Sequence, residues 1–548
     1  MDSKGLITFC IVTLLIFIGW EQIFPTPKPQ PAAQQSQQQQ NTVAAAADAA
    51  LTATVPVKVT TDTVQAVIDE KTGDLRKLSL LKYNSATNES KDFILLDDQK
   101  SHLYIAQSDL LDANGQSLTK NLSYTAAQKE YSLNGDTLEV RLSAPANNGV
   151  QIDKVYTFTK NSYLINVRFD VTNQSGQPVK MDAAYRMVRD HSKPEGEGFF
   201  MHSYTGPVVY TPTGEFQKVD FSDLDKDTQS GRDQAEYERK TNSGWVGMAQ
   251  HYFMSTWILQ PKDGQSVCGG NTCQIEVKRR EDNLYSAGTR VSLPEIQNGT
   301  KHSTQISLYA GPQSTDSIRN IADNLELIKD YGRIYYPATA LFWLLEKLHG
   351  FVGNWGWAIV LLTIIVKAIL YPLTNASYKS MAKMRAVAPK LEALKKQHGD
   401  DRMALQTAMM QMYRDEKINP LGGCLPMLLQ IPVFIGLYWA IFSSVELRQA
   451  PWILWVHDLS RPDPWFILPF LMAATMWFQT TLNPPPTDPM QAKMMKIMPL
   501  VFSFMFFFFP AGLVLYYVVN NLLSIAQQWY INNSIEKQRA QGEVLDKK

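Results

Sequence analysis

The sequence has no excess charge of either sign, because 52 lysine and arginine residues balance 52 aspartate and glutamate residues. A chain without a basic excess gives no electrostatic reason to bind nucleic acid, so DNA is not expected among its partners. The sequence also contains no Gly-x-Gly-x-x-Gly, no phosphate-binding loop and no His-Glu-x-x-His. No catalytic residues and no cofactor are therefore predicted, and the protein is not expected to be an enzyme.

Cysteine is scarce, with four residues in 548. Cys10 and Cys424 lie in apolar segments, where a thiol usually serves as a small hydrophobic group. Cys268 and Cys273 flank a turn-rich tetrapeptide, and they can form a disulfide if their domain lies in an oxidising compartment. A zinc site needs more ligands than this pair offers, so no metal site is predicted.

Apolar residues gather in a short N-terminal stretch and in the last third of the chain, which indicates a soluble part and a membrane part. The N-terminal stretch, 1–24, is either a cleaved secretory signal or an uncleaved transmembrane signal anchor. No small-residue cleavage site follows Trp20, which favours the anchor. Residues 25–54 are mostly Pro, Gln and Ala, and this composition predicts a flexible linker.

The segment 55–330 has the pattern of β-strands. Ile165, Val167, Phe169 and Val171 alternate with polar residues, which turns one face of a strand inward. Asn-Gly and Ser-Gly pairs punctuate the segment and indicate turns. Together these signals predict a large antiparallel β-sandwich with few helices.

The segment 334–350 predicts an amphipathic helix, because its leucines fall on one helical face. Tyr335, Tyr336 and Trp343 suit the headgroup layer of a membrane. Two placements remain open for this helix: in the membrane interface, or packed on the β domain.

The segment 351–531 contains five apolar stretches. The last two are separated at Pro510-Ala511-Gly512, because one helix from Ile497 to Ile531 would be about 52 Å long, whereas the hydrocarbon core is about 30 Å thick. With the N-terminal anchor, the count predicts a polytopic α-helical bundle of six transmembrane helices. The five stretches are Val352–Leu373, Leu421–Phe442, Trp465–Leu482, Ile497–Phe509 and Ala511–Ile531.

Charge orients the predicted spans. The loop Thr374–Asn419 carries nine basic and five acidic residues, whereas Ser443–Pro464 carries two basic and three acidic residues. The positive-inside rule places the first loop in the cytoplasm and the second outside. The N-terminus and the tail, 532–548, are then cytoplasmic, and the β domain is extracytoplasmic.

Lys367 is the one charged residue well inside these five stretches. A lysine at mid-span is costly and usually has a function, although its side chain can also snorkel to the headgroups. Thr363 lies one helical turn before it on the same face. Gln430, Tyr516 and Tyr517 lie at a similar depth and can line a wet groove with Lys367, or pack between helices.

The basic loop predicts a cytoplasmic hairpin of two short helices, 375–418, joined near Gly399-Asp400. Each helix carries an apolar stripe rich in methionine, a flexible side chain that suits a surface accepting many apolar segments. The alternative is that the two stripes pack on each other. The residues predicted to form the receiving surface are Met381, Met384, Leu391, Leu394 and Met409.

Several motifs in the last third resemble the signature of YidC-type membrane-protein insertases (the YidC/Oxa/Alb family), and two upstream motifs fit its Gram-negative branch. The core motifs are Asn419–Pro426, Gln430–Pro432, Tyr371–Thr374, Val445–Arg448, Thr487–Met490 and Phe509–Tyr517, and the upstream ones are Gly244–Val246 and Val352–Gly356.

The resemblance implies a periplasmic β-supersandwich and a five-helix core in the bacterial inner membrane, with a groove open to the cytoplasm and to lipid. It also implies nascent membrane proteins, the Sec translocon, ribosomes and membrane lipids as partners. The family's groove charge is typically arginine, so Lys367 keeps the positive sign but lacks the bidentate fork.

The hypothesis is a membrane-protein insertase and chaperone. Lys367 and its polar neighbours would draw a substrate's polar tail partway into a bilayer that the short fifth span thins. The substrate helix would leave along a hydrophobic slide at Pro426, Phe434 and Phe506. Two alternatives remain: a transporter of a small anion, and a membrane-anchored periplasmic carbohydrate-binding protein.

Overall fold

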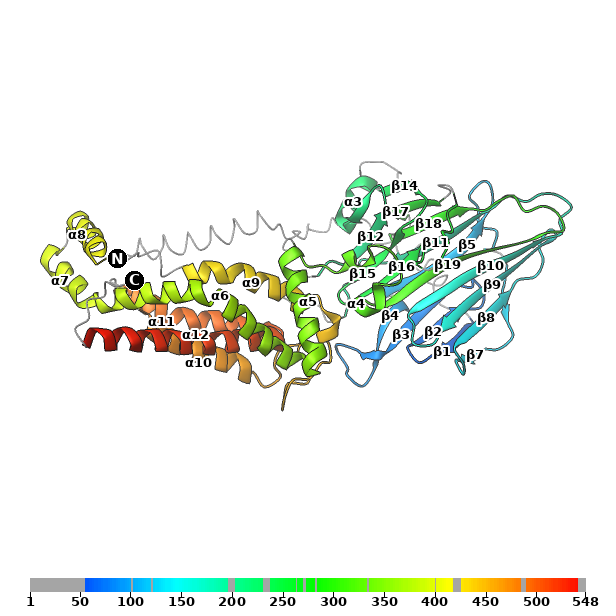
Figure 1. Cartoon of the computed structure of the whole chain (residues 1–548). Coiled ribbons are helices and arrows are strands. Elements are labelled where there is room, and N and C mark those ends of the chain that lie inside the picture. The colour runs from blue at the N-terminus through cyan, green and yellow to red at the C-terminus, as the bar shows by residue number, and fades with distance from the viewer. Residues whose placement is uncertain are drawn as a thin grey trace, which may run out of the picture.

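The computed structural model describes residues 55–99, 102–119, 122–195, 203–229, 237–262, 264–269, 273–280, 283–332, 335–399, 401–416, 425–483 and 489–540. The predicted anchor and linker at 1–54 and the last eight residues lie outside this description. Figure 1 shows an all-β domain at one end and a helical bundle at the other, with helix α5 (Tyr335–Val352) running across the junction.

The β domain consists of two large sheets, which confirms the predicted all-β domain. Every strand pairing is antiparallel except β1 with β7. The first sheet has the order β14 (Tyr237–Thr241), β17 (Cys273–Arg279), β18 (Tyr285–Ser292), β11 (Asp182–Arg189), β5 (His102–Leu111), β4 (Asp92–Gln99), β3 (Leu75–Asn84), β2 (Val64–Asp69), β1 (Pro56–Thr60), β7 (Glu130–Ser132).

The second sheet has nine strands and contains the strand predicted from the alternating pattern. In β10 the four predicted inward residues are buried and their neighbours are partly exposed. The order is β13 (Glu215–Lys218), β12 (Gly206–Thr211), β15 (Trp245–Gln250), β16 (Phe253–Ile258), β19 (Lys301–Pro312), β10 (Leu164–Asn173), β9 (Val150–Thr159), β8 (Thr137–Ser143), β6 (Thr125–Ala126).

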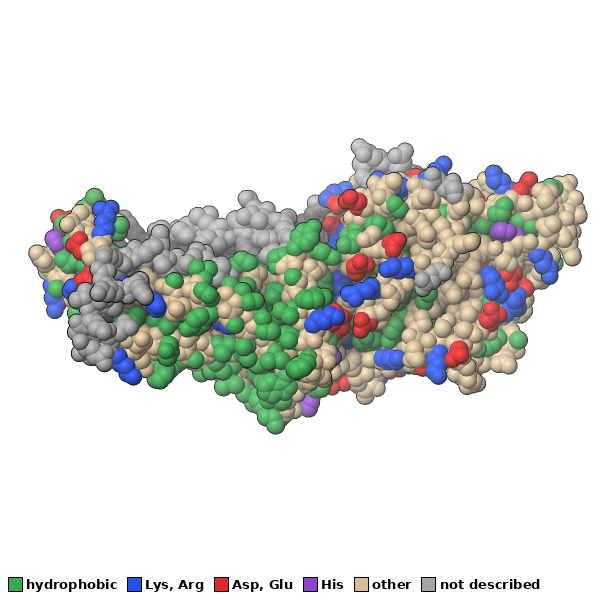
Figure 2. Space-filling view, in the orientation of Figure 1, with side chains coloured by type: hydrophobic (Ala, Val, Ile, Leu, Met, Phe, Trp, Pro, Cys, Tyr) green, Lys and Arg blue, Asp and Glu red, His purple; other side chains and the backbone are tan. Residues whose placement is uncertain are grey.

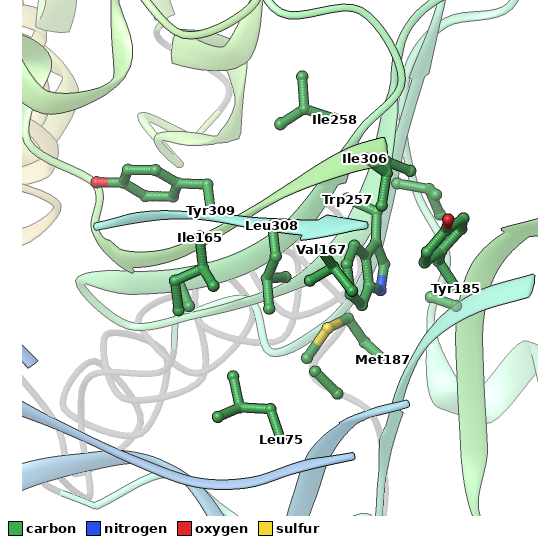
Figure 3. Close-up of a cluster of buried hydrophobic side chains, with 14 of the residues drawn as sticks. Leu75, Ile165, Val167, Tyr185, Met187, Trp257, Ile258, Ile306, Leu308 and Tyr309 are labelled. Carbon is green, nitrogen blue, oxygen red and sulfur yellow. The ribbon is translucent and has the colours of Figure 1, made fainter. Parts of the chain in front are cut away.

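The core of the domain lies between the two sheets. Figure 3 shows Val167, Trp257 and Leu308 of the second sheet facing Tyr185 and Met187 of the first. Removing this apolar surface from water is the main stabilising contribution of the sandwich. Helix α3 (Phe221–Gln229) lies between β13 and β14, and the short segments α4 (Thr315–Ile318) and η1 (Leu325–Ile328) follow the last strand.

The bundle follows α5 in the chain. Its segments are α6 (Trp355–Ala386), α7 (Ala388–His398), α8 (Arg402–Asp415), α9 (Leu425–Phe442), η3 (Val445–Leu447), α10 (Ile467–Leu482), α11 (Pro489–Met505), η4 (Phe506–Phe508) and α12 (Ala511–Ala540). Between η4 and α12 the backbone of Phe509 is extended, so the two helices are separated there.

Among the described residues, one helix, Trp355–Arg385, is long and apolar enough to cross a membrane, judged by length and composition alone. Three shorter apolar helices follow at Gln430–Phe442, Ile467–Leu482 and Ile497–Phe508. Figure 2 shows hydrophobic side chains over the flank of the bundle, whereas charged side chains gather on the β domain and at the far end of the bundle.

Helix α6 continues 13 residues beyond Leu373, where the first span was predicted to end. No glycine or proline interrupts the chain between Thr374 and Ala386, and Pro389 then marks the first turn of α7. Met381 and Met384 therefore lie on the last turns of α6, whereas the prediction placed them on the first helix of the hairpin.

The loop between α9 and α10, here called the connecting loop (Ser443–Phe466), docks against the β domain. The Oε1 atom of Glu446 accepts hydrogen bonds from the ammonium of Lys329 at 2.8 Å and from the main-chain N–H of Thr315 at 2.9 Å. The Lys329 side chain is 3% exposed and the Glu446 side chain 14% exposed. This ion pair is therefore shielded from water, and each charge depends on the other.

Two arginines of the same loop extend this contact. The guanidinium of Arg448 stands over the rings of Phe93, Tyr252 and Phe253 and donates to the carbonyl of Asn84. Arg461 donates to the carbonyls of Ser85 and Ala86 and forms an ion pair with Glu89. The loop is thus fixed to the β domain through three charged side chains.

The end of α9 is also held by the β domain. His251 donates from Nε2 to the carbonyl of Phe442 over 2.9 Å. Burial lowers the pKa of His251 to about 4, so the imidazole is neutral at physiological pH and has one proton to donate.

The connecting loop in turn supports the start of α12. The main-chain N–H of Ala511 donates to the carbonyl of Arg461 at 2.7 Å, and that of Gly512 donates to Leu459 at 2.9 Å. A Cβ at position 512 would lie 3.1 Å from the Leu459 oxygen, which explains the glycine. Contacts of the β domain therefore reach the first turn of α12 through a single loop.

Replacing Lys329 by methionine should lower the free energy of unfolding by about 3–5 kcal/mol, because Glu446 is left buried without its cation. Chemical denaturation of the detergent-solubilised chain measures this change. The double variant Lys329→Met, Glu446→Gln should recover part of the loss.

The exposed pair Lys226–Asp223 provides the matched control, since both of its side chains are largely in water. Lys226→Met should cost less than about 1 kcal/mol. Equal losses for the two methionine variants would contradict a special role for the buried pair.

Candidate functional site

Lys367 lies on α6, and its side chain is half-buried against α12. Its ammonium donates to the Oγ of Ser524 at 2.7 Å, and the Ser524 hydroxyl donates onward to the carbonyl of Asn520 at 2.7 Å. Within the described part of the chain Lys367 forms no ion pair. Its positive charge is therefore held by a neutral hydroxyl and is free to attract an incoming anion.

Ser524 belongs to a row of amide and hydroxyl side chains on α12, here called the polar ladder. These residues recur at helical spacing, so they share one side of the helix. The ladder consists of Asn520, Asn521, Ser524, Gln527, Gln528 and Asn532.

The polar ladder connects α12 to two neighbouring helices. Toward α6, Gln527 donates to the hydroxyl of Thr374 at 3.0 Å. Toward the end of α10, Gln528 donates to the carbonyl of Leu482 at 3.2 Å and to the side chain of Asn483 at 3.0 Å. Polar contacts of this kind hold helices together where apolar surface alone gives little preference.

Three atoms of the ladder remain unsatisfied. Oδ1 of Asn520, Oε1 of Gln528 and Nδ2 of Asn532 are buried and have no hydrogen-bond partner among the residues that the structure describes. A buried amide atom without a partner is unfavourable unless water or another polar group reaches it. The ladder therefore has capacity for further hydrogen bonds along roughly 18 Å of helix, from position 520 to position 532.

Gln430 and Tyr516 meet further along the bundle, where the side-chain amide of α9 donates to the hydroxyl on α12. Tyr516 is buried. It lies eight residues before Ser524, or about 12 Å along the helix. Gln430 and Lys367 therefore contact α12 at two separate positions.

Two of the predicted groove residues have other surroundings. Thr363 is buried and its hydroxyl donates to the carbonyl of Ile359 at 2.7 Å, one turn back on its own helix. Threonine in a helix commonly satisfies itself in this way, so no separate partner is needed. Tyr517 packs between the rings of Phe434 and Phe506, each with its centroid 4.9 Å away.

The three residues predicted to form a hydrophobic slide differ in exposure. Phe506 is fully buried, and Phe434 is half-buried against Tyr517. Pro426 lies in the first turn of α9, and its side chain is outside the described part. Exposed aromatic side chains nearby are Phe502, whose ring packs on Phe506, and Phe504, whose ring packs toward Phe507.

The hairpin formed by α7 and α8 has methionines on both inner and outer faces. Met384, Met409 and Met412 pack around Val387 and Tyr413, so the two stripes contact each other in part. Met381 instead packs against the far end of α12. Leu391 and Leu394 are half-buried on α7, and Met403 and Met410 are exposed on α8.

The structure joins Cys268 to Cys273 by a disulfide that closes the short segment before β17. Both cysteines are fully buried. No group of three or more His, Cys, Asp or Glu side chains suited to a metal ion occurs among the residues that the structure describes.

Two family models match the chain in succession. The YidC periplasmic domain matches residues 56–344, and the 60Kd inner membrane protein matches residues 347–538. The chain belongs to the YidC family of membrane protein insertases. It follows that this is an inner membrane protein with a large periplasmic domain.

Relatives in this family cover the whole chain. The membrane protein insertase YidC of Neisseria gonorrhoeae is 70% identical over 545 residues, which is 100% of both chains. That of Laribacter hongkongensis is 52% identical and covers 99% of this chain and 100% of its own. A crystal structure described as an active YidC insertase with its first transmembrane domain resolved has a TM-score of 0.41 and 19% identity, and the match covers 95% of this chain and 98% of the other.

Polar residues within the apolar stretches predicted Lys367, Gln430 and Tyr516 as site residues, but this reasoning did not include the polar ladder. The signal was present in the sequence, because an otherwise apolar span of 511–531 contains Asn520, Asn521, Ser524, Gln527 and Gln528. These amides also explain why α12 is not among the apolar helices above. A search for polar residues at a spacing of three and four would have identified them.

Replacing Ser524 by alanine should lower the free energy of unfolding in detergent by about 1.5–3 kcal/mol, because a hydrogen bond to a charged group is lost. Ser524→Thr keeps the hydroxyl and should retain most of the stability. In a double-mutant cycle, Lys367→Met should remove most of the cost of Ser524→Ala. Strict additivity of the two changes would show that the two side chains do not interact.

Proposed function

We propose that this YidC-family protein acts on nascent membrane proteins by drawing their polar segments along a hydrophilic groove and releasing their transmembrane helices sideways into lipid. The observation that carries the proposal is the ammonium of Lys367 on a neutral hydroxyl beside the polar ladder, in which Asn520, Gln528 and Asn532 each keep one unpaired buried atom. A site of this kind offers both charge and spare hydrogen bonds to a polar chain inside an apolar bundle.

The proposed topology has six transmembrane helices with both termini in the cytoplasm. The basic segment 374–419 favours a cytoplasmic position, and the weakly charged connecting loop favours the periplasm. In support, the connecting loop contacts the β domain, whereas the hairpin lies at the opposite end of the bundle (Figure 1). Helix α5 would lie in the periplasmic interface, with Tyr336, Trp343 and Phe351 exposed toward the headgroups.

Short helices beside the groove favour a locally thin membrane. The apolar part of the predicted fifth span, Ile497–Phe508, corresponds to roughly 18 Å of helix, and α10, with 16 residues, to roughly 24 Å. The hydrocarbon core of a bilayer is about 30 Å thick, so lipid next to these helices has to thin or the helices have to be shielded. A thinner membrane shortens the path of a polar tail.

The proposed mechanism is not enzymatic. Lys367 attracts an acidic or otherwise polar tail, and the polar ladder supplies hydrogen bonds that replace water along the way. The apolar part of the substrate then partitions into lipid, and the membrane potential acts on charged tails. We place the exit along α9 and α11, where the ring of Phe434 is half-buried and that of Phe502, packed on Phe506, is exposed.

The hairpin is the proposed receiving surface for substrates in the cytoplasm. Its exposed methionines, Met403 and Met410, can adapt to different apolar segments. Its basic residues suit the anionic lipid surface and ribosomal RNA. Ribosomes and the Sec translocon are therefore the proposed partners, and insertion would take place alone or together with the translocon.

Lys367→Leu should impair insertion of substrates with charged translocated tails, whereas Lys367→Arg should be tolerated because it keeps the positive charge. Protease protection of a tail inserted into proteoliposomes measures the effect. A loss of one charge-assisted hydrogen bond corresponds to about 1.5–3 kcal/mol, or roughly 10- to 150-fold. A substrate with an uncharged tail serves as the control, and full activity of the leucine variant on charged tails would refute the electrostatic step.

Deleting the hairpin from Ala388 to Glu416 should weaken insertion more than deleting the strands of the β domain from 57 to 312. The second deletion removes the partners of Arg448 and Arg461 but keeps Thr315 and Lys329, which hold Glu446 of the connecting loop. Insertion of one substrate by both variants, at matched amounts of reconstituted protein, decides the ranking. The opposite ranking would count against a cytoplasmic receiving surface.

A further inference from the structure

The connecting loop has two faces of different character. Its charged residues Glu446, Arg448 and Arg461 bind the β domain. Between them lies a turn without any charge, Trp452-Ile453-Leu454-Trp455-Val456, here called the apolar turn. Its tip is exposed, with 76% of Leu454 and 36% of Ile453 accessible. The loop therefore exposes apolar side chains on the side that does not contact the β domain.

The backbone of the apolar turn holds this tip outward. The N–H of Trp452 donates to the carbonyl of Val456 at 2.9 Å, and the N–H of Val456 donates to Ile453 at 3.1 Å. Leu454 has φ of +52°, a left-handed conformation that is unfavourable for leucine. In water this residue would be both strained and exposed, so the sequence carries an apolar side chain where a turn residue such as glycine or asparagine would fit better.

Tryptophan rings surround the base of the turn. The rings of Trp452 and Trp357 meet edge to face with centroids 5.7 Å apart, and those of Trp455 and Trp465 are stacked at 6.1 Å. A Cβ on Gly356 would come within 2.2 Å of the Trp452 side chain, so this glycine leaves room for the indole. Tryptophan is enriched where a membrane protein passes from hydrocarbon to headgroups.

The apolar turn continues the apolar surface of the bundle. The neighbouring helix starts expose Trp357 on α6 and Phe470 and Leu471 on α10. In Figure 2 the hydrophobic flank of the bundle extends into a projecting apolar point beside the β domain, and Figure 1 shows the connecting loop ending there, level with α5. Continuity with a surface that faces lipid favours lipid as the occupant.

We propose that the apolar turn inserts into the outer leaflet of the membrane, with Ile453 and Leu454 among the acyl chains and the exposed rings of Trp357 and Trp465 at the headgroups. This inference rests on the topology given under the proposed function. The turn would fix the depth of the bundle next to the short helix α10, on the side away from the β-domain contacts. The same loop then connects the β domain, the lipid surface and the start of α12.

The test places a fluorescent probe at the tip. Leu454→Cys, made in a chain with Cys10→Ser and Cys424→Ser so that the buried disulfide remains, is labelled with an environment-sensitive maleimide dye. The labelled chain is reconstituted into phosphatidylethanolamine and phosphatidylglycerol vesicles that contain lipids with a spin label at acyl carbon 5 or 12. Val55→Cys is the matched control, because Val55 is also an exposed apolar residue but lies on the β domain.

We expect blue-shifted emission from position 454, at least twofold stronger quenching by the carbon-5 spin label than at position 55, and little quenching by iodide. Quenching by iodide equal to that at Val55 would overturn the proposal. Protection from both quenchers would also overturn it, because the tip would then be covered by protein. Insertion is measured on the same vesicles: active vesicles with a water-exposed tip refute only the anchor, and inactive vesicles with a lipid-buried tip count only against the proposed function.

Discussion

A positive charge inside an apolar helix bundle needs a hydrogen-bond partner, and in this protein a serine hydroxyl meets that need. The bond from Lys367 to Ser524 fixes how α6 and α12 face each other. Because the partner is neutral, the charge is not cancelled, as it would be by a carboxylate. The same bond places Lys367 next to the polar ladder, so that charge and spare hydrogen-bonding capacity lie together. The site therefore depends on the position of α12.

The β domain contributes to that position from outside the bundle. It binds the connecting loop at Glu446, Arg448 and Arg461. The loop in turn supports the first turn of α12 through main-chain hydrogen bonds. Through these contacts the β domain gives the connecting loop, and with it the start of α12, a fixed support.

Local patterns in the sequence predicted the structural features that depend on residues close together in the chain. The alternation at Ile165–Val171 correctly predicted a strand, and the isolated charge of Lys367 drew attention to the side chain that contacts the polar ladder. What the sequence did not reveal depends on partners far along the chain. Lys329 and Glu446 are 117 residues apart, and neither stands in a recognisable motif with the other. Thr363 was assigned to the groove by its helical face, although its hydroxyl is satisfied within α6.

The buried pair of Lys329 and Glu446 also has a consequence for biosynthesis. During translation at about 5–20 residues per second, Lys329 precedes Glu446 by roughly 6 to 23 s. Throughout this interval the β domain can fold, but a charge at its base has no counterion. On the proposed topology, docking is completed only after the hairpin has been made and the connecting loop has crossed the membrane. The ion pair therefore forms only in a molecule in which α6 and α9, which lie between the two residues in the chain, are already in place.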